Sequence, residues 1–569
     1  MTEPPPVDLG LGQAALPAES LAGLLRRNAA DPAVAGAPAI RVGDRIWTHA
    51  EYLSASCRWA QLFLTYRQEG RPLHVAVLLD NSPEYLFAFG GAALSGGVVV
   101  GVNHTRGGEQ LLHDITHTDC VLLVYDPRHL DLVGPVLDRT GPSLAVGDEL
   151  DAALAGVDPA DPHREAGLED PWALIFTSGT SSAPKAVICS QRRILTTGVR
   201  MATLMGLSSE DVGYLSMPLF HSNGMMVGWA PSVVAGASVA LAPRFSASGW
   251  LPDVRRYGAT YFNYTGKPLA YILAQPEAPD DAENTLRVAY GNEGAPAVVR
   301  AFSERFGVRV IDGFGATEGG LAVTRSDDAP PAAVGLAGPD LRIVDEEGRE
   351  LPRAAFDAGG MLVDPVGCVG EIVNTAGTGV FEGYYNNPEA NARATRNGWY
   401  WSGDLGYLDG NGYLYFAGRT ADWIRVDGEN FAAGPIDVIL SRHPSVTICA
   451  TYGVPDVEAG DRVMAALAVA DPDSFDPEAF AAWIDAQGDL APKWRPTYLR
   501  LGPALPTSPT NKVLTRVLVH EKYRPDLVGS DRLWFRGRGD RSFRSFGEPE
   551  AAALLGELRA AGRERFWEI

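Results

Sequence analysis

The sequence predicts an α/β protein that ends in a smaller α+β domain, and three observations support this. Short apolar runs alternate with amphipathic helical segments between residues 74 and 311. From about Gly335 the pattern changes to turn-rich, alternating strands. It changes again near residue 418, to a compact mixture of strands and helices. Because 569 residues are too many for one core, we expect an N-terminal domain over residues 1–418 and a C-terminal domain over 419–569.

Short apolar runs, each followed by a helical segment, are the expected strands of the first region. A helix opened by Ser82-Pro83-Glu84, for example, follows the first run. Continuous apolar runs are typical of strands buried on both faces, and their alternation with helices predicts parallel sheets covered on both sides. The expected strands are His74–Leu79, Val98–Val102, Val121–Val124, Ala173–Phe176, Val187–Ile188, Ser238–Leu241, Thr260–Phe262, Val288–Tyr290 and Val308–Ile311.

The rest of the chain is expected to form a small β subdomain followed by an α+β region. A small β subdomain is expected from the strands Leu341–Val344, Gly370–Val373 and Gly412–Phe416. Beyond residue 418, strands are expected near Ile448–Val454 and Met464–Val469, with a helix over Pro477–Gln487. A final amphipathic helix over Glu548–Arg563 is expected to pack against its own domain.

Composition and charge exclude several classes of protein. Contents of 46% hydrophobic and 21% charged residues are ordinary for a soluble globular protein. A formal net charge of −22 argues against nucleic-acid binding, which needs clustered lysine and arginine. Five glycines interrupt the apolar stretch Leu86–Val102, so we expect a buried helix and a strand there, and no membrane span.

The N-terminus and the cysteines together predict a cytoplasmic location. The first ten residues contain no basic leader and no apolar run, so neither a signal peptide nor a transit peptide is expected. The cysteines are odd in number and far apart, which is typical of buried thiols in a reducing compartment. They are Cys57, Cys120, Cys189, Cys368 and Cys449.

The first candidate site is a turn rich in serine, threonine and glycine that ends in a lysine. Backbone N–H groups, hydroxyls and an ammonium at such close spacing could hold the oxygens of a polyphosphate. The spacing differs from G-x-x-x-x-G-K-[ST], so the common nucleoside-triphosphatase loop is excluded. The alternative is a surface turn of small polar residues. The candidate ligands are Thr177, Ser178, Gly179, Thr180 and Lys185.

The second candidate site is the stretch Asp312–Gly320, which follows an expected strand. Its glycines let a flat ring approach the backbone, Phe314 offers a face for stacking, and Asp312 could accept a hydrogen bond from an exocyclic amine. Glu318 is a hard oxygen ligand that suits Mg²⁺. The alternative is a strand-to-helix turn capped by its threonine and glutamate.

Two further stretches carry single candidate residues. Asp404 lies between glycines, where a buried aspartate could bind two ribose hydroxyls, and Arg419 could meet ribose or phosphate. Lys512 follows two prolines in a turn and could be delivered into a distant site as a mobile charge. The alternatives are a turn aspartate and two solvated surface cations.

Taken together and in this order, the four stretches resemble the adenylate-forming superfamily of acyl-CoA synthetases, luciferases and peptide-synthetase adenylation domains. The resemblance spans roughly residues 20–520. It implies an N-terminal domain of two α/β subdomains and a β subdomain, followed by a small mobile C-terminal domain. It also implies a reaction with ATP and Mg²⁺ that turns a carboxylate into an acyl-AMP, with coenzyme A as the acceptor.

The resemblance assigns a role to each candidate. It implies that the loop Thr177–Lys185 holds the β- and γ-phosphates of ATP, and that Thr180 and Glu318 surround Mg²⁺. Asp404 would bind the ribose with Arg419 near it, and Lys512 would be the catalytic lysine that bridges the carboxylate and the α-phosphate. The adenine would lie against Asp312, Gly313, Phe314, Gly315, Ala316 and Thr317, where many relatives carry tyrosine in place of this phenylalanine.

A histidine and a hinge complete the catalytic assignment that the resemblance implies. His221 matches the position of an aromatic residue or histidine at the mouth of the acyl site; the alternative is a packed or capping histidine. Rotation near Ala421 would exchange the two half-reactions, although relatives usually carry Asp or Lys there. Asp427 is a second departure, since small or basic residues are more common beside the thiol channel.

The acid is predicted to be fatty, or else functionalised or aromatic. Residues 258–273 and 291–294 are similar to the fatty-acid-transport-protein branch, which activates long and very long fatty acids. Tyr261, Tyr264 and Gly291 are the expected pocket residues, and the tyrosines make the lining less purely aliphatic than a fatty-acid tunnel needs. The expected partners are the acid, ATP and coenzyme A, in a monomer or homodimer that binds no nucleic acid.

Two alternatives to a carboxylate–CoA ligase remain at this point. The first is an adenylating enzyme with another acceptor, which could be an amine, a carrier-protein thiol or nitrite. The second is a non-catalytic protein that binds a nucleotide or an acyl group. The presence of Lys512, Glu318 and Asp404 together argues against the second alternative.

Overall fold

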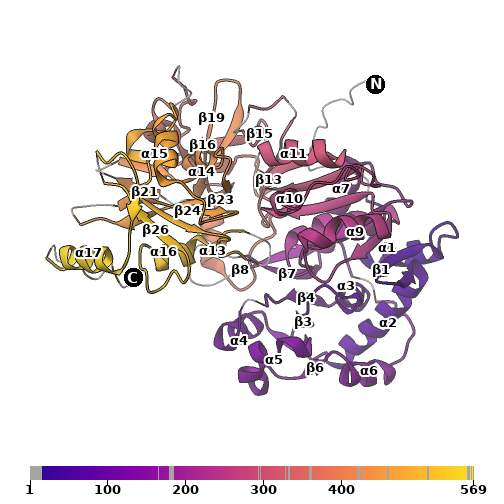
Figure 1. Ribbon diagram of the computed structural model, residues 1–569. Coiled ribbons are helices and arrows are strands. Elements are labelled where there is room, and N and C mark those ends of the chain that lie inside the picture. Colours follow the sequence, from indigo (N-terminus) through magenta and orange to yellow (C-terminus); the bar gives the residue numbers. More distant parts are fainter. Residues whose placement is uncertain are drawn as a thin grey trace. The chain divides into compact units, whose positions relative to one another are not determined.

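The protein forms two compact units in the computed structural model (Figure 1). One comprises residues 1–320 with 378–396, and the other comprises 321–377 with 397–569. The β strands expected from residue 335 thus share a unit with the C-terminal region, and the domain boundary near residue 418 stays a prediction. The described residues are 16–560 without 105, 165, 178–184, 293, 295, 327, 331–332, 358–361, 420–422, 427–428, 458–460, 509–511 and 538, plus 564 and 567.

The first sheet of the first unit has the strand order β6-β5-β3-β4-β7-β8. Its neighbours pair in parallel, except for the antiparallel pair of β7 and β8. Strands β3, β4 and β5 are buried throughout, which explains their continuous apolar sequences. The strands are β3 (His74–Leu78), β4 (Val98–Gly101), β5 (Cys120–Tyr125), β6 (Ser143–Ala145), β7 (Pro171–Thr177) and β8 (Lys185–Ser190).

The second sheet of this unit runs β13-β12-β11-β9-β10-β1-β2. All neighbours are parallel except the hairpin of β1 and β2, which the sequence analysis did not anticipate. The predicted α/β class with parallel sheets is therefore confirmed. The strands are β1 (Pro38–Val42), β2 (Arg45–Thr48), β9 (Val212–Leu215), β10 (Ser238–Leu241), β11 (Tyr261–Thr265), β12 (Val288–Asn292) and β13 (Arg309–Gly315).

Helices of the first unit pack closely against one another and against its sheets. A Cβ atom at Gly90 would lie 2.0 Å from Oγ of Ser56, so glycine lets α3 approach α2. As expected, the stretch Leu86–Val102 forms a buried helix and a strand. The helices are α1 (Leu21–Ala30), α2 (His49–Thr65), α3 (Pro83–Ser95), α4 (Gly108–His117), α5 (Leu130–Val133), α6 (Asp148–Ala155), α7 (Gln191–Met205), α8 (Ala230–Ala235), α9 (Ala247–Tyr257), α10 (Pro268–Leu273), α11 (Pro296–Phe306) and α13 (Pro388–Ala394).

The second unit contains a β sheet and an α+β region, as the sequence predicted. The first sheet is antiparallel with the order β15-β20-β19-β17-β16, and the second has the order β23-β24-β25-β26-β27. Its strands include β15 (Gly335–Leu336), β16 (Leu341–Val344), β17 (Gly370–Asn374), β19 (Trp399–Leu408), β20 (Tyr413–Arg419), β23 (Val446–Pro455), β24 (Asp461–Val469), β25 (Tyr498–Gly502), β26 (Arg532–Phe535) and β27 (Arg544–Ser545), and its helices include α14 (Gly434–Leu440), α15 (Pro477–Asp485), α16 (Thr515–Glu521) and α17 (Glu548–Ala560).

The stretch after residue 525 packs on its own domain, as expected. Strand β26 pairs with β25 and so extends the second sheet. The buried guanidinium of Arg500, on β25, forms ion pairs with Asp531 at 2.6 Å and with Glu521. All five cysteines are buried, and burial raises the pKa of Cys57 to about 11. Over the described part of the chain, no helix combines the length and the apolar character that crossing a membrane would require.

Candidate active site

The hairpin of β7 and β8 brings the two ends of the first candidate site together. Thr177 ends β7, Lys185 begins β8, and the two residues are direct partners in the antiparallel register. Ser178, Gly179 and Thr180 lie outside the described residues, so their phosphate contacts stay a prediction. The hairpin nevertheless fixes both ends of the loop at the carboxyl end of β7, the edge of a parallel sheet where ligands usually bind.

Tyr384 connects two of the expected site residues. Its hydroxyl donates a hydrogen bond of 2.8 Å to Oε1 of Glu318, and its ring centroid lies 5.0 Å from Nζ of Lys185. The backbone of residues 383–385 pairs with β8, and Asn391 bonds both the N–H and the carbonyl of Tyr384. The structure therefore places Lys185, the lysine of the first candidate site, and Glu318, the expected magnesium ligand, beside the same phenol.

A buried arginine ties β8 to the second candidate site. Arg193 donates to the carbonyl of Ile188 at 2.8 Å and to the carbonyl of Thr317. Gly319 has a positive φ of 69°, and a Cβ atom there would lie 2.6 Å from Val380. Glycine is thus favoured next to Glu318, because its positive φ is rare for other residues and a side chain there would overlap Val380.

The second candidate site differs in one respect from the expectation. A turn was expected from Asp312, but β13 continues to Gly315, and its pairing with β12 runs through Asp312 and Gly313. Oδ2 of Asp312 accepts hydrogen bonds from the hydroxyl of Tyr264 at 2.6 Å and from the N–H of Gly294 at 2.9 Å. Phe314 and Ala316 also lie on this segment, and their contact with adenine stays a prediction, as does that of Gly313.

Tyr264 and Gly291 meet at the carboxyl ends of β11 and β12. The ring of Tyr264 covers Gly291 so closely that a Cβ atom there would lie 2.6 Å from the ring and 2.5 Å from the carbonyl oxygen. Burial, the negative charge of Asp312 and the hydrogen bond to it raise the pKa of Tyr264 well above its ordinary value. The phenol thus remains protonated and donates to Asp312.

Tyr261 lies on the opposite face of the sheet from Tyr264. Side chains alternate along a strand, so residues three apart on β11 point to opposite faces. The hydroxyl of Tyr261 donates to the carbonyl of Gly228 at 2.6 Å, and its ring is fully buried. These contacts place Tyr261 in the core on the other face of the sheet from Tyr264, and its part in an acyl pocket stays a prediction.

His221 lies in a segment that is bonded to both Tyr264 and Thr317. The N–H of Asn223 donates to Nδ1 of His221 at 3.3 Å. The amide of Asn223 donates to the carbonyl of Tyr264 at 2.9 Å, and the hydroxyls of Ser222 and Thr317 are 2.8 Å apart. The segment leads into a π-helix over Asn223–Trp229, a feature that often marks functional sites.

The remaining candidates belong to the second unit. Asp404 is 6% exposed on β19 and is the direct register partner of Arg419 on β20, so the two expected ribose ligands are neighbours. Lys512 is half-buried; its N–H donates to Oγ of Ser508 at 3.1 Å and its carbonyl accepts from the N–H of Ser508 at 2.7 Å. Ala421 and Asp427 lie outside the described residues.

Tyr384 was not found by sequence analysis. It lies 66 residues from Glu318 along the chain and 199 from Lys185, in a Gly-Tyr-Tyr-Asn stretch with no recognisable motif. Six residues that sequence analysis selected belong to the first unit. Contacts within this unit link them into two groups: Lys185 and Glu318 around Tyr384, and Tyr264, Asp312, Thr317 and His221.

The chain is similar to known proteins over most of its length. The chain is 44% identical to the steroid-22-oyl-CoA synthetase of Rhodococcus jostii, over 93% of this chain and 96% of that protein. It is 47% identical to a medium/long-chain-fatty-acid–CoA ligase of Mycobacterium tuberculosis, over 82% and 89%. It is 32% identical to the human long-chain fatty acid transport protein 1, over 86% and 80%.

Solved structures show the same fold. An anthranilate CoA ligase in complex with anthranoyl-AMP matches with a TM-score of 0.75 at 22% identity, over 89% of this chain and 98% of that chain. An ATP-bound MatB from Rhodopseudomonas palustris matches with a TM-score of 0.75 at 24% identity, over 87% and 98%. A family model described as "AMP-binding enzyme" matches residues 25–385. The predicted resemblance to adenylate-forming enzymes is confirmed, and the chain belongs to the AMP-binding enzyme family.

Proposed function

We propose that this chain activates a bulky apolar carboxylic acid, either a steroid side-chain carboxylate or a medium- to long-chain fatty acid. It is an AMP-forming carboxylate–CoA ligase that uses ATP, Mg²⁺ and coenzyme A as substrates and cofactor. Support for the acid class comes from two relatives of more than 40% identity, a steroid-22-oyl-CoA synthetase and a medium/long-chain-fatty-acid–CoA ligase. The cytoplasmic location expected from the sequence belongs to the same proposal.

The contact of Tyr384 with both Lys185 and Glu318 carries the proposal for the nucleotide site. Lys185 supplies a positive charge at the end of the phosphate loop, and Glu318 supplies a carboxylate for Mg²⁺. The Tyr384 hydroxyl donates to one oxygen of Glu318, as second-sphere donors do to carboxylates at metal sites. Mg²⁺ held there would neutralise phosphate charge, with Thr180 as a second expected ligand.

The contacts of Tyr264 carry the proposal for the acyl site. Tyr264, Gly291 and Asp312 lie together at the carboxyl ends of β11, β12 and β13, and the His221 segment is bonded to Tyr264 through Asn223. In this proposal His221 faces the carboxylate end of the acid.

Charge neutralisation by a lysine completes the adenylation step. Lys512 in its turn of the second unit would bridge the attacking carboxylate and the α-phosphate as pyrophosphate leaves. Asp404 and its register partner Arg419 would hold the ribose. Rotation near Ala421 would then remove Lys512 and admit the thiol of coenzyme A for the second half-reaction.

The test is a substrate panel assayed for pyrophosphate and AMP release, with and without coenzyme A. The panel would contain a steroid side-chain acid, fatty acids of increasing length, benzoate and acetate. The proposal expects pyrophosphate release with the steroid or longer fatty acids, stimulation of AMP release by coenzyme A, and a thioester product detected by mass spectrometry. Preference for acetate or benzoate, or turnover stimulated only by an amine or nitrite, would contradict it.

A further inference from the structure

Three polar side chains converge at the edge of the first sheet where its parallel strands end. Asp80 follows β3, His104 follows β4 and His129 follows β5, within the short 3₁₀ helix Pro127–His129. These three strands are parallel neighbours in the order β5-β3-β4, so their carboxyl ends lie at the same edge. The topology therefore brings an aspartate and two histidines together, although Asp80 and His129 are 49 residues apart along the chain.

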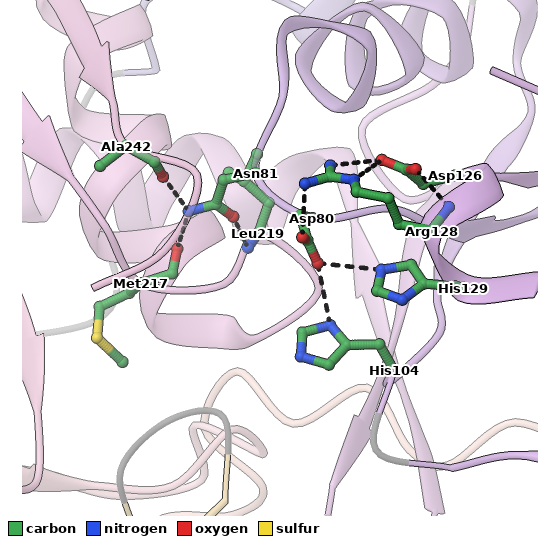
Figure 2. Close-up of polar contacts among 9 residues, drawn as sticks. All are labelled: Asp80, Asn81, His104, Asp126, Arg128, His129, Met217, Leu219 and Ala242. Carbon is green, nitrogen blue, oxygen red and sulfur yellow. Dashed lines mark hydrogen bonds and ion pairs between the residues drawn. The ribbon is translucent and has the colours of Figure 1, made fainter. Parts of the chain in front are cut away.

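The three ligand atoms have the separations of a metal site. Oδ1 of Asp80 lies 3.0 Å from Nε2 of His129 and 3.7 Å from Nδ1 of His104, and all three atoms lie within 4.8 Å of one another (Figure 2). Tetrahedral bonds to zinc of about 2.0–2.1 Å place two ligand atoms about 3.3 Å apart. The two shorter separations bracket this value, so a cation between the atoms requires only small side-chain movements.

Hydrogen bonds do not give every polar atom of this cluster a partner. Oδ1 of Asp80 is within hydrogen-bond distance of His129 but not of His104, because 3.7 Å is too long. Nδ1 of His104 is buried and has no hydrogen-bond partner among the residues that the structure describes. The imidazoles of His104 and His129 also stack, with ring centroids 5.3 Å apart and planes 10° apart, beside the same carboxylate oxygen. A cation would give all three atoms a partner.

The surroundings hold the aspartate in position. Arg128 forms an ion pair of 3.4 Å with the other oxygen of Asp80, Oδ2, and is itself held by Asp126 at 2.5 Å. The adjacent Asn81 donates to the carbonyls of Met217 and Ala242 and accepts from the N–H of Leu219, which fixes the backbone there (Figure 2). Such outer contacts orient carboxylate ligands at metal sites.

We infer that Asp80, His104 and His129 form a binding site for a divalent transition-metal ion, with Zn²⁺ the best fit. Two imidazole nitrogens and one carboxylate oxygen suit zinc, whereas Mg²⁺ and Ca²⁺ prefer all-oxygen sites. The side chains retain 25%, 27% and 13% exposure, so an ion can reach them and water can complete the coordination. This site is separate from Glu318, the ligand proposed for the nucleotide's Mg²⁺.

The experiment measures zinc binding by the full-length protein after treatment with a chelator. Zn²⁺ would be titrated in competition with a chromophoric chelator, without ATP or acid, so the result does not depend on the proposed function. A second titration with Co²⁺ would follow the visible absorption that reports tetrahedral coordination. We expect one Zn²⁺ per chain at this site, an absorbing Co²⁺ complex, and no displacement by millimolar Mg²⁺.

Variants assign the binding to these residues. His104→Gln and His129→Gln are each expected to weaken Zn²⁺ binding by at least about 100-fold, and Arg128→Gln by about 10-fold as an outer contact. His163→Gln is the matched control, because His163 lies 3.9 Å from Asp161 with 82% exposure and belongs to no three-residue cluster in the described chain. It should bind as the wild type does.

Two results would overturn the inference. One is a wild-type protein that takes up no Zn²⁺ under these conditions, a measurement that needs no variant to fold. The other is equal loss or equal retention of zinc in His104→Gln, His129→Gln and His163→Gln, which would assign the binding to surface histidines. Melting temperatures of the apo variants would confirm that each one folds, and Asp80→Asn replaces any that does not.

Discussion

Removal of one hydroxyl from Tyr384 tests the proposed nucleotide site. Tyr384→Phe deletes the 2.8 Å hydrogen bond to Glu318 but keeps the ring beside Lys185. A hydrogen bond to a charged group contributes about 1.5–3 kcal/mol. Because Glu318 is partly exposed, water can replace part of this bond, so the lower value of about 1.5 kcal/mol applies. That value corresponds to a roughly 10-fold loss in kcat/KM for ATP.

A second substitution separates the hydroxyl from the ring. Tyr384→Leu also removes the aromatic face near the ammonium of Lys185, which at a partly exposed site contributes a further 0.5–1 kcal/mol or about 2- to 5-fold. Tyr385→Phe is the matched control, since its hydroxyl donates to Asp119 and contacts neither Lys185 nor Glu318. Initial rates of pyrophosphate release would be measured over a range of ATP concentrations. If Tyr384→Phe and Tyr385→Phe behave alike, Tyr384 does not act through Glu318.

Three further predictions concern packing, a buried charge and pH. Gly291→Ala should lower the melting temperature and raise KM for the acid, because the new methyl group overlaps Tyr264 and overpacking costs about 1–3 kcal/mol; an unchanged melting temperature would contradict the close contact. Asp531→Ala should lower the free energy of unfolding by about 2–3 kcal/mol, and with it the urea midpoint, because the buried Arg500 then keeps Glu521 but loses Asp531. Asp526→Ala, on the surface, should leave the midpoint unchanged. Burial opposes ionisation of Asp211, but hydrogen bonds from a hydroxyl, a backbone amide and a guanidinium lower its pKa below the ordinary value. The ionised carboxylate therefore stabilises the folded protein fully above about pH 4, and this stabilisation disappears as the pH falls through the lowered pKa. Asp211→Asn should flatten the fall of the melting temperature at acid pH.

Several of the strands that sequence analysis found are continuous apolar runs that the fold buries on both faces. β3, β4 and β5 are continuous apolar runs, so composition alone located them within one or two residues. The hairpin of β1 and β2 was missed because its residues are only partly buried, although Gly43 at its turn, with a φ of 59°, was an available signal. β13 was ended too early because backbone pairing with β12 continues through glycines and an aspartate.

The residues of the candidate site were predictable by type, but their partners were not. Lys185, Glu318 and Asp312 were selected from local motifs as expected phosphate, metal and adenine ligands, because such ligands need particular residue types. Tyr384 and the cluster of Asp80, His104 and His129 have no local motif. They are brought together by the order of strands in a sheet and by the segment paired to β8, which no spacing along the chain encodes.

The position of the segment that carries His221 depends on contacts with both sheets of the first unit. On one side, Asn81 at the edge of the first sheet bonds Met217 and Leu219, and the ring of His104 lies edge-on to that of Phe220, with centroids 5.1 Å apart. On the other side, Asn223 is bonded to a strand of the second sheet. His221 is therefore fastened from both sheets of the first unit.

This attachment yields a last prediction, which rests on the proposed zinc site. Zinc held by His104 restrains the imidazole that contacts Phe220, so amide hydrogen exchange in residues 217–221 should slow when Zn²⁺ is added to the wild type. His129→Gln removes a ligand but keeps the ring of His104 against Phe220, so in that variant Zn²⁺ should leave the exchange rate unchanged. Slower exchange in both proteins would show that zinc acts on the segment from another site, and no change in a zinc-loaded wild type would show that the cluster and the His221 segment are mechanically independent.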